Sequence, residues 1–164
     1  LRSQGRPAEA EPLFREAVAM RTALLGADHS DVQLARSALA NALVAQGRYA
    51  EAESLFTAAL AARRARFGPA HGAVAASLAD LGRLAIRRDD LGAAEPRLRE
   101  AADVFDRYGD RVAARNARLD LARALFKAGR AGDGAQLTTR VRADLRAGPG
   151  RGDVGTVRAL QLAA

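Results

Sequence analysis

The chain has 164 residues, enough for one domain or a short array of repeated units with a continuous apolar interior. Aromatic residues are only 4% and tryptophan is absent, so we expect a helical core of alanine, leucine and valine. The net charge is +7, and the sequence contains neither a cysteine nor a run of about 18 apolar residues. These features exclude a disulfide framework, a thiolate metal site and a membrane-spanning helix, and they predict a cytoplasmic protein.

An internal repeat organises the sequence. The motif Gly-Arg-x-Ala-Glu-Ala-Glu at residues 5–11 returns at 47–53, which is 42 residues later. Over residues 5–46 and 47–88, 16 of 42 positions are identical. A fixed period of this size is typical of arrays in which pairs of helices stack on one another.

The first predicted helix spans residues 7–25. Its apolar residues recur at spacings of three and four, which is the stripe of an amphipathic helix. We interpret it as the second helix of a pair whose first helix lies upstream of this chain. An apolar face at Leu13, Phe14 and Val18 would then be left bare.

The next unit is predicted as a pair of helices at 31–46 and 49–66, separated by the break at Gly47. Either Ser30 or Asp31 is expected to cap the first helix of this pair. The small side chains of Ala40 and Ala52 would let the two helices touch.

The later units follow the same pattern, with helices predicted at 73–88, 91–108, 111–127 and 131–146. The period shortens to 40 residues from Asp89 to Gly129. Val112 and Phe126 are among the expected core residues of the third of these helices. Gly132 and Gly134 lie in the first turn of the last helix, so we expect it to fray. Residues 147–164 are interpreted as a Gly/Pro-rich loop and a short terminal helix.

The Ala-Glu-Ala-Glu-x-Leu-Phe helix and the Gly-x-x-His-x-x-Val loop resemble the tetratricopeptide repeat (TPR), in the 42-residue form found in kinesin light chains. In the best unit the key positions of the family fall on Leu39, Ala40, Leu43, Gly47, Tyr49, Ala52, Phe56 and Ala59. The resemblance implies an all-α, right-handed superhelical solenoid of antiparallel helix pairs with about three and a half repeats. Its units would lie at about 1–26, 27–68, 69–109 and 110–146.

For function, the resemblance implies a non-catalytic module that binds a protein or peptide on its concave face. The first helices of the repeats line that face. The contact positions carried over from the family include Ser37, Asn41, Arg83, Arg87, Arg123 and Lys127, and Asn116 and Asp120, which lie close by, complete the expected site. The basic members favour a partner with acidic residues or a C-terminal carboxylate. The simpler interpretation is a solvated charged face, in which Asp80 and Asp120 offset the basic side chains.

Two other functional classes stay open. The chain could be the C-terminal regulatory region of a bacterial signalling enzyme such as a Ser/Thr protein kinase, a place where the family often occurs. A basic repeat protein that binds nucleic acid is the weaker alternative, because residues 1–46 and 89–128 are neutral and no aromatic residues are interleaved for base stacking.

Catalytic and metal chemistry have little support in the sequence. His29 and His71 occupy the same loop position in successive repeats, where a ring that completes a helix cap is the expected role. Two histidines in separate loops make a poor metal set, and no phosphate-binding glycine loop or nucleophile motif is present. We therefore predict no catalytic residues, no metal and no cofactor.

Overall fold

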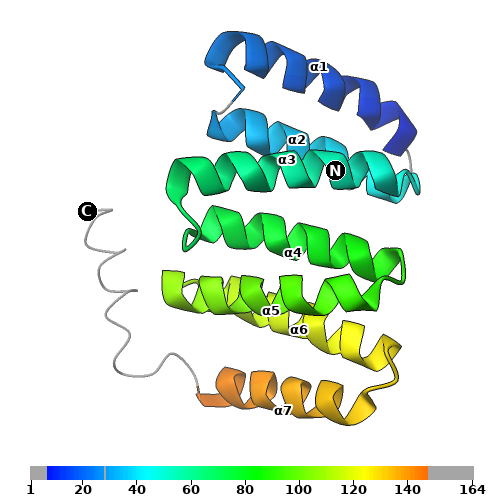
Figure 1. Ribbon diagram of the computed structural model, residues 1–164, viewed down its shortest axis with the longest axis vertical. Coiled ribbons are helices and arrows are strands. Elements are labelled where there is room, and N and C mark those ends of the chain that lie inside the picture. The colour runs from blue at the N-terminus through cyan, green and yellow to red at the C-terminus, as the bar shows by residue number, and fades with distance from the viewer. Residues whose placement is uncertain (1–6, 28, 148–164) are drawn as a thin grey trace.

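The computed structural model describes residues 7–27 and 29–147, and these residues form seven helices and no strand. The helices are α1 (Pro7–Leu25), α2 (Ser30–Ala45), α3 (Tyr49–Phe67), α4 (Gly72–Arg87), α5 (Leu91–Tyr108), α6 (Arg111–Lys127) and α7 (Ala131–Ala147). Each helix packs on the next along the chain, and they stack in order along the long axis of the molecule (Figure 1). The predicted loop and terminal helix beyond Ala147 lie outside the described residues.

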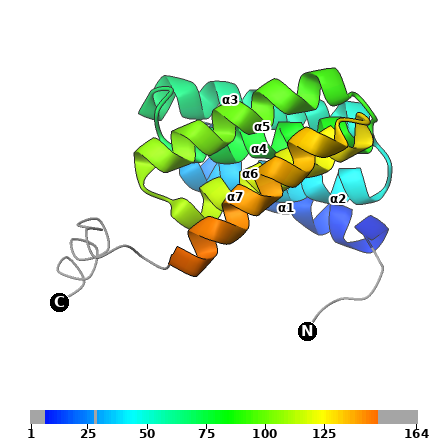
Figure 2. The ribbon, with the colours of Figure 1, turned by 90° about the horizontal axis from the view of Figure 1, so that it is seen from below.

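The stack is a twisted array. Besides the contacts between consecutive helices, α4 also touches α6, so the first helices of neighbouring repeats lie side by side. Seen from below, α3, α5 and α7 are turned progressively relative to one another (Figure 2). This arrangement confirms the predicted all-α solenoid of antiparallel helix pairs.

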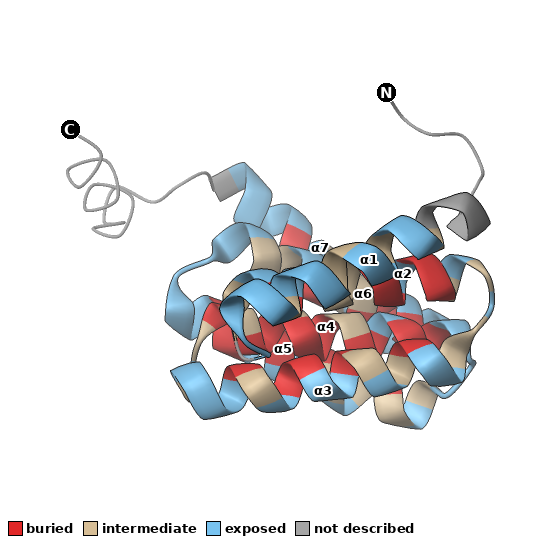
Figure 3. Ribbon diagram, turned by 90° about the horizontal axis from the view of Figure 1, so that it is seen from above, coloured by how far each residue is buried: buried red, intermediate tan, exposed pale blue. Residues whose placement is uncertain are grey.

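The core runs between the helices as a chain of small and medium apolar side chains. Phe56 is its largest fully buried side chain, at 1% exposure, and Ala40 and Ala52 are completely buried beside it, as predicted. Figure 3 shows buried residues on the inner sides of the central helices and a mostly exposed outer face on α1. Burial of one face per helix is what holds such an array together.

Two expectations about apolar residues were wrong in part. On α1, Leu13 is exposed, but Phe14 and Val18 are half-buried because they pack against the core cluster around α2 and α3. On α6, Val112 and Phe126 are exposed rather than part of the core. The helical period places a residue on a face, but the neighbouring helices decide whether that face is covered.

Histidine side chains cap the first helices of two repeats. The Nδ1 atom of His29 accepts a hydrogen bond from the Asp31 N–H at 3.2 Å, and the Nδ1 atom of His71 accepts one from the Ala73 N–H at 3.1 Å. The predicted role of the histidines is therefore confirmed. The expected caps Ser30 and Asp31 were wrong, because α2 begins one residue earlier and both lie inside it.

The turn between the two helices of a repeat needs a left-handed backbone at one position. Gly47 and Gly129 occupy it with φ of 76° and 75°, and Asp89 occupies it with φ of 62°. Glycine adopts this conformation without steric cost, whereas aspartate is one of the few other residues that tolerate it. This substitution explains how Asp89-Asp90 replaces the Gly-Arg turn of the other repeats.

Two further glycines are explained by close contacts. A Cβ atom on Gly82 would lie 2.5 Å from the Leu98 side chain, so its absence lets α4 and α5 approach. A Cβ atom on Gly134 would lie 3.0 Å from the ring of Phe126. The expected fraying of the last helix is not observed: α7 is continuous from its first turn, and Gly134 packs under Phe126.

These contacts predict opposite effects of the same substitution at two helical glycines. Gly82→Ala should lower the free energy of unfolding by about 1–3 kcal/mol, because the clash with Leu98 outweighs the better helix propensity of alanine. Gly132→Ala is the matched control, since no atom lies within 4 Å of the added Cβ, and it should raise stability by about 0.5–1 kcal/mol. Urea unfolding followed by circular dichroism measures both, and a stabilised Gly82→Ala variant would contradict the close approach.

Candidate binding surface

The predicted partner-binding residues lie on α2, α4 and α6. Asn41, Arg83 and Arg123 occupy the same register on these three helices, and all three side chains are exposed. Arg87, Asn116 and Lys127 are also exposed, whereas Ser37 and Asp120 are half-buried. We call these eight residues the first-helix row.

Acidic side chains within the array already engage part of this row. Arg83 Nη2 lies 2.5 Å from Asp80 Oδ1, and Arg83 Nη1 lies 3.3 Å from Asp120 Oδ2. Asp120 also lies 3.7 Å from Arg123, so its carboxylate sits between arginines of α4 and α6. One acidic residue thus joins two neighbouring repeats across the row.

Lys127 is held by the turn between α4 and α5. Its Nζ atom lies 2.8 Å from Asp89 Oδ1 and donates a hydrogen bond to the Ile86 carbonyl at 3.2 Å. By contrast, Arg87 has no ion-pair partner among the described residues, and the side chain of Arg123 is 69% exposed. The available positive charge of the row therefore lies at Arg87 and Arg123.

The structure adds a buried arginine that the sequence analysis did not identify as part of a site. Arg63 extends from α3 between the first helices, where its Nη1 donates to Ser77 Oγ at 2.6 Å and its Nη2 to Ser37 Oγ at 3.4 Å. Burial lowers the pKa of the Arg63 guanidinium, and the nearby Asp80 charge acts in the opposite direction. The one signal in the sequence was the recurrence of arginine at residues 21 and 63, which are one 42-residue period apart.

Two arginines, Arg63 and Arg83, act on the carboxyl group of Asp80. Burial raises the pKa of its carboxyl group, while the charge and hydrogen bond of Arg83 and the charge of Arg63 lower it. Asp80, Arg83 and Asp120 thus form a contiguous set of ion pairs on the exposed row, and Arg63 acts on Asp80 only at longer range.

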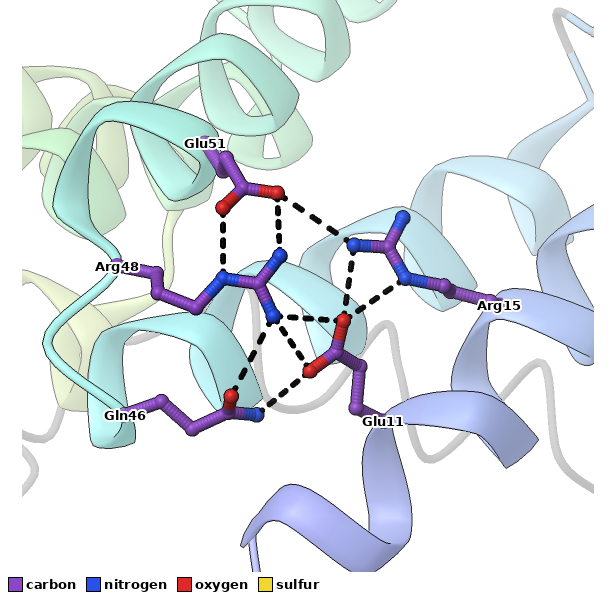
Figure 4. A network of polar contacts seen from close by, with 5 residues as sticks. All are labelled: Glu11, Arg15, Gln46, Arg48 and Glu51. Carbon is purple, nitrogen blue, oxygen red and sulfur yellow. Dashed lines mark hydrogen bonds and ion pairs between the residues drawn. The ribbon is translucent and has the colours of Figure 1, made fainter.

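A second polar network joins α1 to the turn between α2 and α3 and to the start of α3 (Figure 4). Arg48 Nη1 lies 2.7 Å from Glu11 Oε2, and Arg48 Nη2 lies 2.6 Å from Glu51 Oε2. Gln46 donates to Glu11 at 3.0 Å, and Arg15 lies 2.8 Å from the same carboxylate. Both oxygens of the Glu11 carboxylate thus face donors from the same or the next repeat.

The glutamate of this network has a counterpart in each of the next two repeats. Glu53 pairs with Arg88, and Glu95 Oε2 lies 2.7 Å from Arg130 Nη1. In all three cases the start of a second helix is tied to the turn of the following repeat. These pairs hold neighbouring repeats in register, so the network around Glu11 is structural rather than a binding site.

Comparison with known proteins now identifies the family. Two models of the tetratricopeptide repeat match the chain, one over residues 31–107 and one over residues 1–31. The chain belongs to the tetratricopeptide repeat family. No curated protein matches it. Within the described residues, no TPR helix is both long and apolar enough to cross a membrane.

Solved structures with the same fold include kinesin-light-chain-like proteins. A variant of a candidate kinesin light chain from Podosopora anserina, with nearly identical TPR-like repeats, matches with a TM-score of 0.74 at 23% identity, over 85% of this chain and 66% of that one. A second structure of that protein gives 0.70 at 23% identity, over 90% and 70%. BtubC (BKLC) from P. vanneervenii gives 0.77 at 17% identity, over 85% and 56%. The chain thus spans 66% of the first of these structures and 56% of BtubC. The likeness to them establishes the TPR fold.

The network in Figure 4 predicts a pH-dependent loss of stability. Hydrogen bonds from Gln46 and Arg15, with Arg48, lower the pKa of Glu11 to about 2 from 4.5. Because the folded-state pKa is below the unfolded value, this contribution is present above about pH 4.5 and is lost as the pH falls toward 2. Thermal unfolding of the parent between pH 6 and pH 2 should therefore show a steeper fall in Tm than that of Glu11→Gln.

The matched control for this experiment is Glu16→Gln, which removes an exposed carboxylate of the same helix outside the network. It should keep the pH dependence of the parent. Parallel curves for the parent and Glu11→Gln would contradict a role of the Glu11 carboxylate in stability.

Proposed function

We propose that this TPR array is a non-catalytic docking module whose first-helix row binds a peptide segment bearing acidic residues or a C-terminal carboxylate. TPR arrays bind proteins or peptides, and the finer statement about this row rests on its charges. The observation that carries it is the pair of available cations, Arg87 on α4 and Arg123 on α6, on neighbouring first helices.

The balance of charge along the row favours a moderately acidic partner. Its four cations face three carboxylates, those of Asp80, Asp89 and Asp120, so the local excess is small. A strongly anionic polymer such as nucleic acid would meet the aspartates as well as the arginines, and repulsion would oppose it. A short peptide can instead place one carboxylate near Arg87 and another near Arg123.

Hydrogen-bonding groups complete the row. Asn41 and Asn116 are exposed on α2 and α6, and an amide side chain both donates to and accepts from a peptide backbone. Asp80 and Asp120 fix Arg83 between them, which orders that guanidinium before a partner arrives. A partner therefore binds to a partly pre-organised surface and loses less side-chain entropy.

We further propose that this docking takes place in the cytoplasm, which rests on the composition of the sequence. A place within a larger bacterial signalling enzyme concerns residues outside this chain and stays a prediction.

Two charge reversals on the row should weaken partner binding. The chain is used as bait beside Arg87→Glu/Arg123→Glu, and each capture is done with and without nuclease. Captured proteins are then confirmed by titrating synthetic acidic segments against the bait. Affinity should fall at least about tenfold, which corresponds to about 1.4 kcal/mol. Raising the salt concentration should weaken binding to the parent, because the contacts are solvent-exposed ion pairs.

The control is Arg107→Glu/Arg142→Glu, which changes the net charge equally at exposed positions of the second helices α5 and α7. It should bind as the parent does. Equal loss in both double variants would show that net charge alone drives capture, and loss on nuclease treatment would assign binding to nucleic acid. Either result would contradict the proposed docking surface.

A further inference from the structure

A cavity of about 220 Å³ lies at the edge of the array where α3 is connected to α4 (left in Figure 1). The N-terminal turns of α2 and α4 and the last two turns of α3 form its wall. Leu34, Ala62, Phe67 and Ala73 supply apolar surface. The ring of Phe67 stacks on His71 with centroids 4.5 Å apart, so this part of the wall is held in place.

Two arginines line the cavity: Arg63, which is only 7% exposed, and Arg66, whose guanidinium lies 5.3 Å from the centroid of the Phe67 ring. The hydrogen bonds of Arg63 within the described part of the protein reach three neutral oxygens, those of Ser77, Ser37 and the Ala73 carbonyl at 3.5 Å. A guanidinium has five N–H groups, so two of them have no acceptor among the described residues. Among the described residues, no carboxylate lies within ion-pair distance of Arg63.

Burial of a cation without a contacting anion lowers the stability of a folded protein, so a buried Arg63 is unusual. Asp80 acts on it only at longer range, and that carboxylate is committed to Arg83. An anion that entered the cavity would give the two unused N–H groups a charged acceptor.

A second unsatisfied polar group lies in the same wall. Gln33 is 2% exposed and lines the cavity, and its Nε2 donates to the Ala27 carbonyl at 2.7 Å. Its Oε1 atom has no hydrogen-bond partner. An ionised carboxylate only accepts hydrogen bonds, so this oxygen has to be paired by an N–H or O–H group of the ligand rather than by its carboxylate.

The helix ends at this edge favour an anion on balance. α2 begins at Ser30 and α4 begins at Gly72, and helix N-termini carry partial positive charge. α3 ends at Phe67, and its negative end offsets one of the two. None of the described residues that line the cavity is acidic.

We infer that this cavity binds a small carboxylate attached to an apolar group, with Arg63 holding the carboxylate and Leu34 and Phe67 enclosing the apolar group. The volume suits this class: a protein cavity of about 150 Å³ holds benzene, and pockets for drug-sized ligands begin at about 300 Å³. A ring with a short acidic side chain fits between these limits. The same chemistry occurs in a free organic acid and in the C-terminal residue of a protein.

The inference is independent of the first-helix row. Ser37 is the one residue that both share, through its hydrogen bond with Arg63. The row depends on Arg87 and Arg123, neither of which lines the cavity. Either site can therefore fail without the other.

The first test compares 3-phenylpropionate with its neutral amide by ligand-observed NMR and by ¹⁵N chemical-shift mapping. The acid should bind with a dissociation constant on the order of 1 mM, as expected for a fragment of this size, and shift the amides of α2, α3 and α4 at the cavity. The amide should bind at least about tenfold more weakly. Equal binding of acid and amide, or no binding of the acid at about 10 mM, would overturn the inference.

The second test removes the cation. Arg63→Met keeps most of the side-chain volume and should abolish the preference for the acid. The matched control is Arg64→Met, which removes the neighbouring exposed guanidinium that lies 2.9 Å from Glu100, and it should keep the preference. Unchanged acid binding in Arg63→Met would contradict the assignment.

A third pair of variants leaves the buried arginine in place. Leu34 is 59% exposed, so Leu34→Glu and Leu34→Gln should both fold, which circular dichroism verifies. Leu34→Glu places a carboxylate at the mouth of the cavity and should weaken acid binding at least about fivefold more than Leu34→Gln does. Equal affinities in these two variants would contradict a charged ligand site.

The source of the carboxylate is separated by acetyl-Gly-Gly-Phe as the free acid and as the C-terminal amide. If the peptide acid binds more tightly than 3-phenylpropionate, the natural occupant is the C-terminal residue of a partner. If it binds no better, the occupant is a free acid. Binding of the peptide amide as tightly as the peptide acid would overturn carboxylate recognition.

Discussion

Close approach of neighbouring helices is the constraint on which this array depends. With few aromatic residues available, contact area has to come from backbones that nearly touch, and small residues make this possible. Ala40 and Ala52 are fully buried, and Gly82 leaves room for Leu98 where even one methyl group would not fit. The same demand places glycine in the first turn of α7, against the propensity of a helix interior.

Packing of alanine faces fixes the distance between helices better than their register, and polar pairs between repeats supply the register. A glutamate near the start of α1, α3 and α5 meets a basic side chain from the turn of the next repeat. The turn is held in place by a left-handed residue, which is Asp89 in one repeat and glycine in the others. Apolar contact and ion pairs thus act on different degrees of freedom of the same stack.

The helical period in the sequence was sufficient to predict the helices, their order and the repeat, because the spacing of apolar residues is a local property. Burial of a charged residue is not local. Arg21 and Arg63 occupy the same position in successive repeats, yet Arg21 is exposed and Arg63 is buried between serines of α2 and α4. The predicted row was placed on the expected helices, but its ion pairs depend on Asp120 reaching across to α4. The cavity depends on three helices at once, and no segment of the sequence contains it.

Arg63 and the first-helix row are held by different kinds of contact. On the row, Asp80 and Asp120 form ion pairs with Arg83, and Asp80 acts on Arg63 only at longer range. Arg63 is held instead by hydrogen bonds to neutral oxygens of Ser37, Ser77 and Ala73 on α2 and α4. Because these bonds leave the charge of Arg63 without a contacting carboxylate among the described residues, we assign an anion to the cavity independently of the row.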